Sequence, residues 1–172
     1  MPAPGSAIPR STPVGPLAWE VLPVAIPAQV DQPQWVVRTA DGSLAMLEQE
    51  RWIAPLGEEI RAAVSEGLVQ LVGTPAPMAT TSPGQRWRVR IDVQRFDSAP
   101  GSQARLEATW TLRSDADGAV TLSCHGEFVQ PLSSVGYPAL AQAHQQGVAR
   151  LAGAIGAALK AMSSGRPASC AG

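Results

Sequence analysis

Three stretches in the second half of the chain alternate apolar and polar residues with a period of two. They cover residues 86–94, 105–113 and 120–128, and this alternation predicts strands that bury one face and expose the other. A turn falls at residues 115–118, where Asp117-Gly118 favours a hairpin. The pattern predicts an antiparallel meander. Its inward residues are Trp87, Val89, Ile91 and Val93, then Leu106, Ala108, Trp110 and Leu112, then Val120, Leu122, Cys124 and Phe128.

Three further strands are predicted nearer the N-terminus. Residues 17–26 form an apolar run that Pro23 restricts to a sheet edge or a bulge, because proline lacks the N–H that a central strand needs. Residues 35–38 and 44–49 are two further strand candidates. The Asp41-Gly42 pair between them is a strong hairpin signal.

Two helices are predicted from apolar spacings of three and four residues. The first begins at Pro55, ends at Gly73-Thr74-Pro75, and has an apolar face of Leu56, Ile60, Val64, Leu68 and Leu71. The second covers residues 138–162 and has the stripe Leu140, Val148, Leu151, Ile155, Leu159 and Met162. Only Arg150 and Lys160 are charged in this helix, so we expect it to be covered on more than one side. Close packing is expected to compensate for the helix-weakening residues Gly147, Gly153 and Gly156.

These elements predict an α+β fold with a single domain, in which an antiparallel sheet of about five to six strands has two helices packed on one face. The flanking segments differ in composition. Five prolines in residues 1–16 disfavour both helix and sheet, which predicts a Pro-rich tether. The expected domain therefore covers residues 17–162, and residues 163–172 are expected to form a flexible, polar tail.

The composition limits the possible functions. Of the 172 residues, 45% are hydrophobic and only 16% are charged, and the net charge is −1. A globular core is expected, whereas a general field that would attract nucleic acid or anionic lipid is not. No run of about 18 apolar residues indicates a transmembrane helix. The two cysteines, Cys124 and Cys170, are not expected to form a disulfide, because flexible tails seldom hold the required geometry.

Few residues are candidates for a chemical site. His125 and Glu127 share one face of a predicted strand and could be two metal ligands, but a solvated polar face is the favoured interpretation. Cys124 points to the other face, as a small core residue. His144 lies among glutamines and is expected to be an exposed helix residue. No phosphate loop, nucleophile elbow or metal-binding motif is present. The sequence therefore predicts no catalytic, cofactor-binding or metal-binding residues, no cofactor, and a protein that is not an enzyme.

Basic residues gather on the polar faces of the first two strands of the meander. This region has six arginines and three acids (Asp92, Asp97 and Glu107), which gives a local net charge of +3. The arginines are Arg86, Arg88, Arg90, Arg95, Arg105 and Arg113. One alternative is a module that binds nucleic acid through the Arg86/Arg88/Arg90 face, but that mode needs aromatic residues on the same face. Trp87 and Trp110 alternate to the opposite face. A solvated or subunit-facing ladder of charges is favoured. A small hydrolase whose site is not visible in the sequence is the other alternative.

Several short segments carry a resemblance to a known family through their order and spacing. They are residues 21–27, Asp31 to Arg38, Trp52 to Leu56, residues 93–97, the strand Ala108-Thr109-Trp110, and the helix opening Ala141-Gln142-Ala143-His144. Together they resemble the paraquat-inducible protein C family of ABC-type transport auxiliary lipoproteins, over residues 17–162.

The resemblance implies a function in the envelope of Gram-negative bacteria. Family members are outer-membrane lipoproteins that work beside an ABC transporter and a membrane-spanning MCE-domain protein that moves lipids between the two membranes. The implied function is a non-enzymatic accessory lipoprotein that forms a homo-oligomeric ring, a docking collar or outlet on the periplasmic face of the outer membrane. The sequence has neither a signal peptide nor a lipobox cysteine, so the N-terminal lipid anchor is expected to be missing from this chain.

Overall fold

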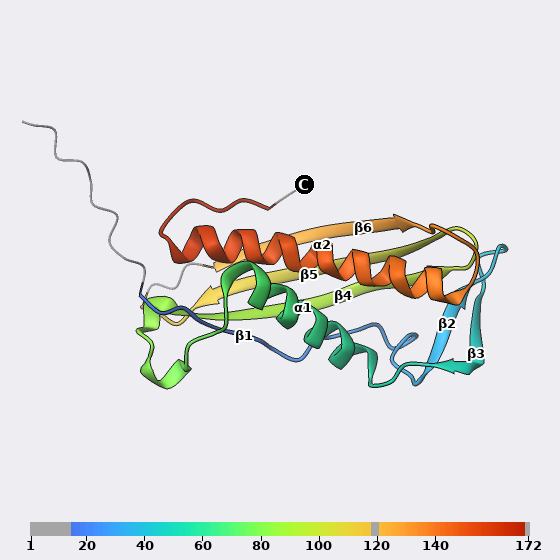
Figure 1. Ribbon diagram of the computed structural model, residues 1–172, viewed down its shortest axis with the longest axis horizontal. Helices are drawn as coiled ribbons and strands as arrows, with labels where there is room; N and C mark the ends of the chain where they lie inside the picture. Colours follow the sequence, from blue (N-terminus) through green and yellow to red (C-terminus); the bar gives the residue numbers. More distant parts are fainter. Residues whose placement is uncertain (1–14, 118–120, 171–172) are drawn as a thin grey trace, which may run out of the picture.

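The computed structural model describes residues 15–117 and 121–170, and it has an elongated α+β architecture (Figure 1). The predicted fold class is therefore confirmed. Residues 1–14 of the expected tether, and Gly118 and Val120 of the predicted meander, lie outside the described residues. In chain order the elements are β1 (Ala18–Val21), β2 (Gln34–Arg38), β3 (Leu44–Arg51), α1 (Leu56–Val72), the 3-10 helices η1 (Met78–Thr80) and η2 (Pro83–Gln85), β4 (Arg86–Ala99), β5 (Gln103–Ser114), β6 (Thr121–Pro131) and α2 (Tyr137–Ser163).

The strands divide into two sheets, of four and two strands, where one sheet of five to six was expected. The larger sheet has the order β1-β4-β5-β6, and β4, β5 and β6 form the predicted antiparallel meander. β1 pairs with β4 in parallel, which differs from the predicted all-antiparallel sheet. A parallel pair needs a long crossover connection, and here the segment with β2, β3 and α1 provides it. Pro23 lies beyond the end of β1 on this edge, as its missing N–H predicts.

A β-bulge in β4 changes which side chains face the core. The pairing register of β4 with β5 shifts between Val93 and Arg95. Up to Val93 the odd-numbered residues are buried, whereas beyond the bulge the buried residues are Phe96 and Ser98. The extra residue at the bulge, Gln94, moves the alternation by one position. β4 therefore continues to Ala99, well past the last residue that strict alternation predicts.

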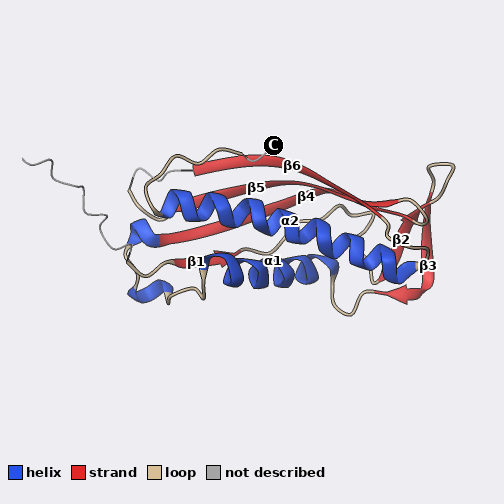
Figure 2. Ribbon diagram, turned by 45° about the horizontal axis from the view of Figure 1, so that its top comes forward, coloured by secondary structure: helices blue, strands red, loops and turns tan. Residues whose placement is uncertain are grey.

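The two helices lie side by side on one face of the larger sheet, as predicted (Figure 2). The inward residues of the meander and the apolar faces of both helices form one core cluster, whose fully buried members include Leu68, Ile91, Leu112, Leu151 and Ile155. Burial of this apolar surface is the main driving force of the fold. The other face of the sheet carries the charged residues.

Glycines allow the helices to approach closely. A Cβ atom at Gly156 of α2 would lie 2.8 Å from a methyl carbon of Leu71, and one at Gly67 of α1 would lie 2.8 Å from Cβ of Ala152. The expected close packing of α2 is thus found at Gly156. A Cβ atom at Gly147 would lie at an ordinary contact distance, 3.8 Å from Cβ of Leu106, and one at Gly153 would have no atom within 4 Å. Only one of the three α2 glycines therefore marks a close approach.

Helix α2 is buried mainly by contacts with α1, β5 and β6 of the same subunit. α1 lies along one side of it, and β5 and β6 lie beneath it (Figures 1 and 2). Thirteen of its 27 residues are buried. The low charge of α2, which predicted cover on more than one side, is explained by these contacts.

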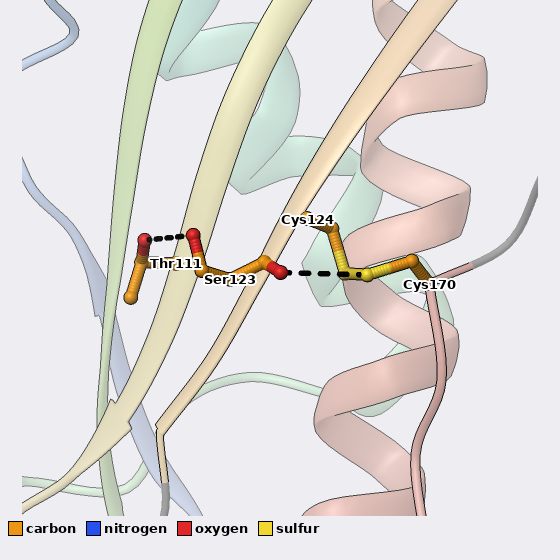
Figure 3. The surroundings of a disulfide bond; sticks show 4 residues. All are labelled: Thr111, Ser123, Cys124 and Cys170. Carbon is orange, nitrogen blue, oxygen red and sulfur yellow. Dashed lines mark hydrogen bonds between the residues drawn. A yellow bond between two sulfur atoms is a disulfide. The ribbon is translucent and has the colours of Figure 1, made fainter.

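The expectation about the cysteines is wrong, because Cys124 and Cys170 form a disulfide. Cys124 is buried on the inward side of β6, and the segment after α2 turns back so that Cys170 reaches it (Figure 3). Ala168 packs against the main core on the way, and the backbone N–H of Arg166 donates to the Ala161 carbonyl oxygen (2.9 Å). The polar composition of residues 163–172 predicts a free tail. The contacts that fix this segment come from β6 and α2, and its own composition does not reveal them.

We predict that the disulfide stabilises the fold measurably. A Cys170→Ser variant should lose about 2–4 kcal/mol of unfolding free energy, because the bond closes a long loop in the unfolded chain. For a domain of this size that loss lowers the midpoint of thermal unfolding by about 5–15 °C. Circular dichroism melts measure it, and reductant added to the variant is the control, because it should cause no further change. An unchanged melting temperature in the variant would contradict the prediction.

Candidate functional site

Exposed apolar side chains gather at the end of the molecule that carries the smaller sheet. We call this the apolar end and define it by Leu44 and Met46 on β3, Ile53 between β3 and α1, and Val135 between β6 and α2. Figure 1 shows β3 and these two connections at the same end of the molecule. Ile53 is fully exposed and Val135 is 92% exposed. Large side chains with this exposure contribute nothing to the core, so they are candidates for a contact surface.

A hollow of about 350 Å³ opens beside Ile53. Residues 31–33 form one wall and residues 52–55 the other, with the half-buried ring of Trp52 between them. Both segments belong to the stretches that carry the family resemblance. The backbone N–H of Trp52 donates to the carbonyl oxygen of Pro33 (3.0 Å), which fixes the two walls relative to each other.

An aromatic cluster supports the apolar end from behind. Trp35 of β2 packs against Trp52, with ring centroids 4.9 Å apart, and Trp52 contacts Phe96 edge-on at 5.8 Å. Phe96 stacks on the imidazole of His144, with centroids 3.9 Å apart and an interplanar angle of 9°. Such pairs stabilise a fold beyond the area that they bury. The cluster joins β2, β4, α2 and the β3–α1 connection, so it fixes the smaller sheet on the rest of the domain.

His144 lies in the core of this cluster, which corrects the expectation that it is exposed. Its side chain is only 5% exposed. The indole N–H of Trp35 donates to Ser98 Oγ (2.8 Å), and Ser98 Oγ lies 2.7 Å from His144 Nε2. The serine hydroxyl can also accept from Nε2 or donate to it, so the direction of this contact follows the tautomer of the imidazole. Burial lowers the pKa of His144 to about 3, against a smaller raising effect of the Asp97 carboxylate.

A serine in contact with a histidine is the arrangement of an activated nucleophile, but this pair lacks the other requirements. Ser98 is 1% exposed, so a substrate has no access to its hydroxyl. The lowered pKa of His144 makes it a weak base at neutral pH. Nδ1 has no partner within residues 15–117 and 121–170, so no carboxylate orients the ring. The pair is best explained as a buried polar contact that helps to hold the aromatic cluster together.

Four of the six arginines of the meander are paired with acids, whereas Arg86 and Arg113 make no ion pair within the described residues. Arg88 contacts Glu20 (2.8 Å) and Asp115 (2.6 Å), and Arg90 contacts Asp92 (3.1 Å). Nearer the apolar end, Arg95 and Arg105 contact Glu107, each at 3.8 Å. Trp87 and Trp110 are buried on the opposite face, as the alternation predicts. Most of the arginine charge is therefore neutralised, and no aromatic stacking platform from these two tryptophans shares the face. Both observations favour the solvated or subunit-facing interpretation over nucleic-acid binding.

His125 and Glu127 share the outer face, as predicted, but they contact different partners. His125 Nε2 lies 3.4 Å from a carboxylate oxygen of Glu107, and Glu127 pairs with Arg105 at 3.0 Å. In the described part of the chain, no group of three His, Cys, Asp or Glu side chains could hold a metal ion. The part that the structure describes also contains no helix long and apolar enough to cross a membrane.

The family model for the ABC-type transport auxiliary lipoprotein component matches residues 1–156. The chain therefore belongs to this family, which confirms the resemblance found in the sequence. Two solved structures share the fold. One is an uncharacterized protein with 18% identity and a TM-score of 0.65, over 83% of this chain and 93% of that one. The other is a DUF330 protein from Xanthomonas campestris with 18% identity and a TM-score of 0.63, over 92% of this chain and 90% of that one. No curated protein gives a significant match.

We predict that His144 makes the fold sensitive to acid. The unfolded chain takes up this proton near pH 6.5 and the folded protein only near pH 3, so the unfolded state binds more protons between these values. Stability should therefore fall as the pH drops through this window, by about 2 kcal/mol from pH 7 to pH 5 for this group. Urea unfolding at both pH values measures the difference. His144→Phe should lose this part of the pH dependence, whereas the exposed His125→Gln should keep it. If the unfolding free energy changed equally between the two pH values in the wild type and both variants, His144 would not be the group responsible.

Proposed function

We propose that this chain is a non-enzymatic accessory lipoprotein of an MCE/ABC-type lipid transport system, and that it acts as a docking collar or outlet on the periplasmic face of the outer membrane. The observation that carries the proposal is the match of residues 1–156 to the family of ABC-transport auxiliary lipoproteins. Residues 1–16 serve as the tether of the folded domain at residues 17–162, and the lipid anchor belongs at the N-terminal side of the tether.

The disulfide supports a location outside the cytoplasm. Disulfides persist in oxidising compartments such as the bacterial periplasm and are rare where thiol reductants are abundant. The Cys124–Cys170 bond fixes the C-terminal segment on the domain. A protein whose fold includes this bond suits the periplasmic side of the envelope.

The apolar end supports a role in binding another protein. Its four apolar side chains are exposed on two connections and one edge strand. Interfaces that last are built around apolar anchors of this kind, with polar residues at their rim. Glu48 and Glu50 on β3 and Gln32 beside the hollow are candidates for such a rim. We assign the apolar end to contact with the MCE partner.

The chain should co-elute with its MCE-domain partner when the two are purified together. Ile53→Asp should weaken this association at least tenfold, because it places a charge at the most exposed apolar anchor of the apolar end. Val69→Asp is the matched control: Val69 is also an exposed apolar residue, at 40%, but it lies on α1 outside the apolar end. Lipid that crosslinks to both proteins would support transport through the pair. If the proteins never associate while the chain alone turns over an ester or phosphate, the enzyme alternative takes the place of this proposal.

The second part of the proposal is a closed ring of identical subunits. Since α2 is buried against α1, β5 and β6, its low charge no longer argues for assembly, and the ring rests on the resemblance to the family. Rings form when each subunit presents two different complementary patches. Because the apolar end is assigned to the MCE partner, we assign the subunit contact to the outer sheet face, where arginines and carboxylates can pair across a contact as they pair within one chain.

Light scattering should accordingly give a particle mass several times the 17.9 kDa of the single chain. The measurement is made at micromolar concentration on chain that carries its N-terminal lipid, both alone and with the MCE partner. High salt should shift the distribution towards smaller particles if charges of the sheet face lie in the subunit contact. A monomer under all of these conditions would rule out the ring.

A further inference from the structure

A second hollow lies at the opposite end of the molecule from the apolar end. Its volume is about 640 Å³, within the range of sites that hold small ligands. Trp87 of β4, Leu122 of β6 and Met162 of α2 line it from the domain. Arg166, Pro167 and Ala168 of the C-terminal segment line it from outside. We call it the tether-end hollow.

The C-terminal segment is fixed over the tether-end hollow at both of its ends. On one side the backbone N–H of Arg166 donates to the Ala161 carbonyl oxygen of α2 (2.9 Å). On the other, Cys170 is bonded to Cys124 of β6 (Figure 3). Ala168, between them, packs on the core. The disulfide therefore maintains one wall of the hollow.

One buried donor beside the tether-end hollow is unpaired. Trp87 is 3% exposed, and its indole N–H has no acceptor among the described residues. The buried indoles of Trp19 and Trp35 both have one, the Gly73 carbonyl oxygen and Ser98 Oγ. A buried polar group without a partner is uncommon in a native fold. The nitrogen itself has almost no accessible surface, so Trp87 contributes its ring to the lining of the hollow, and Ser114 and Thr121 contribute hydroxyl groups.

The charges of the tether-end hollow are balanced. Arg166 is the one basic side chain and Asp117 the one acidic side chain among the described residues that line it. A ligand that carries both charges, such as a zwitterionic headgroup, matches this pair better than an anion does. The apolar lining suits a hydrocarbon chain.

The position of the tether-end hollow indicates where such a ligand comes from. β1 begins at this end, where Ala18 pairs with Arg86 and Trp19 pairs with Trp87. In a lipoprotein anchored at its N-terminus, this end is therefore the one at which the chain enters the folded domain from the anchor.

We propose that the tether-end hollow binds one acyl chain of a zwitterionic phospholipid from the membrane that holds the anchor, with the phosphate beside Arg166. Pro167 and Ala168 cover the acyl chain, and the disulfide retains them there. This inference rests on the N-terminal lipid anchor of the proposed function, and it is independent of the MCE partner.

The test measures quenching of tryptophan fluorescence in the full disulfide-bonded chain by phosphatidylethanolamine with brominated acyl chains. Quenching requires contact between bromine and an indole ring. We expect saturable quenching in the wild type and in Trp110→Phe, which removes a buried indole of the same sheet away from the hollow. Trp87→Phe should lose most of it. Circular dichroism checks that both variants fold.

Two variants at exposed positions test the site without changing the core. Arg166→Gln should bind the brominated lipid about two- to fivefold more weakly, the range for an exposed ion pair. Lys160→Gln, which removes a charge from α2 outside the hollow, should bind as the wild type does. Cys170→Ser should release the lipid faster, because Pro167 and Ala168 are no longer held over it.

Equal quenching of the wild type and Trp87→Phe would overturn the proposal, as would equal affinity of Arg166→Gln and Lys160→Gln. Binding that is unsaturable or the same in every variant would mean adsorption to the protein surface, which also overturns it. The assay contains only this chain and lipid. Failure to bind the MCE partner would therefore leave its result unchanged, and a negative lipid result would leave the docking proposal standing.

Discussion

The fold depends on burying one face of the β4–β6 meander under two helices at close range. The inward residues of these strands are apolar along most of their length, and neither helix alone covers them. The helices lie side by side because Gly67 and Gly156 leave room for Ala152 and Leu71. An interior packed at native density tolerates little change in volume. The outer sheet face, both ends of the molecule and the C-terminal segment are all arranged around this contact.

Periodicity in the sequence predicted the parts of the fold that are local. Alternation identified β4, β5 and β6, and spacings of three and four residues identified both helices to within two residues at each end. Proline and glycine identified the edge position of β1 and the β2–β3 turn, where Gly42 has a positive φ of 87°. Each of these patterns depends only on residues that are close together in the sequence, so a single sequence is sufficient to detect it.

The parts that were missed depend on contacts between distant residues. The bulge at Gln94 ended the alternation that would have shown Phe96 and Ser98 to be inward, so the partners of His144 were hidden. His144 itself had a detectable signal: it lies four residues after Leu140 and four before Val148, in the apolar stripe of α2. The glutamines around it obscured that spacing. The parallel pairing of β1 and the Cys124–Cys170 bond join segments far apart in sequence, and composition carries no information about either.

The length of β4 determines how far apart the two ends of the molecule stand. Its 14 residues cover roughly 45 Å at the usual rise of an extended strand. The chain enters the domain at one end of this strand, and the apolar end lies at the other (Figure 1). A domain whose first residues are fixed in place can therefore act as a rigid spacer. It carries its exposed apolar side chains up to the length of one strand away from the point where the chain enters the fold.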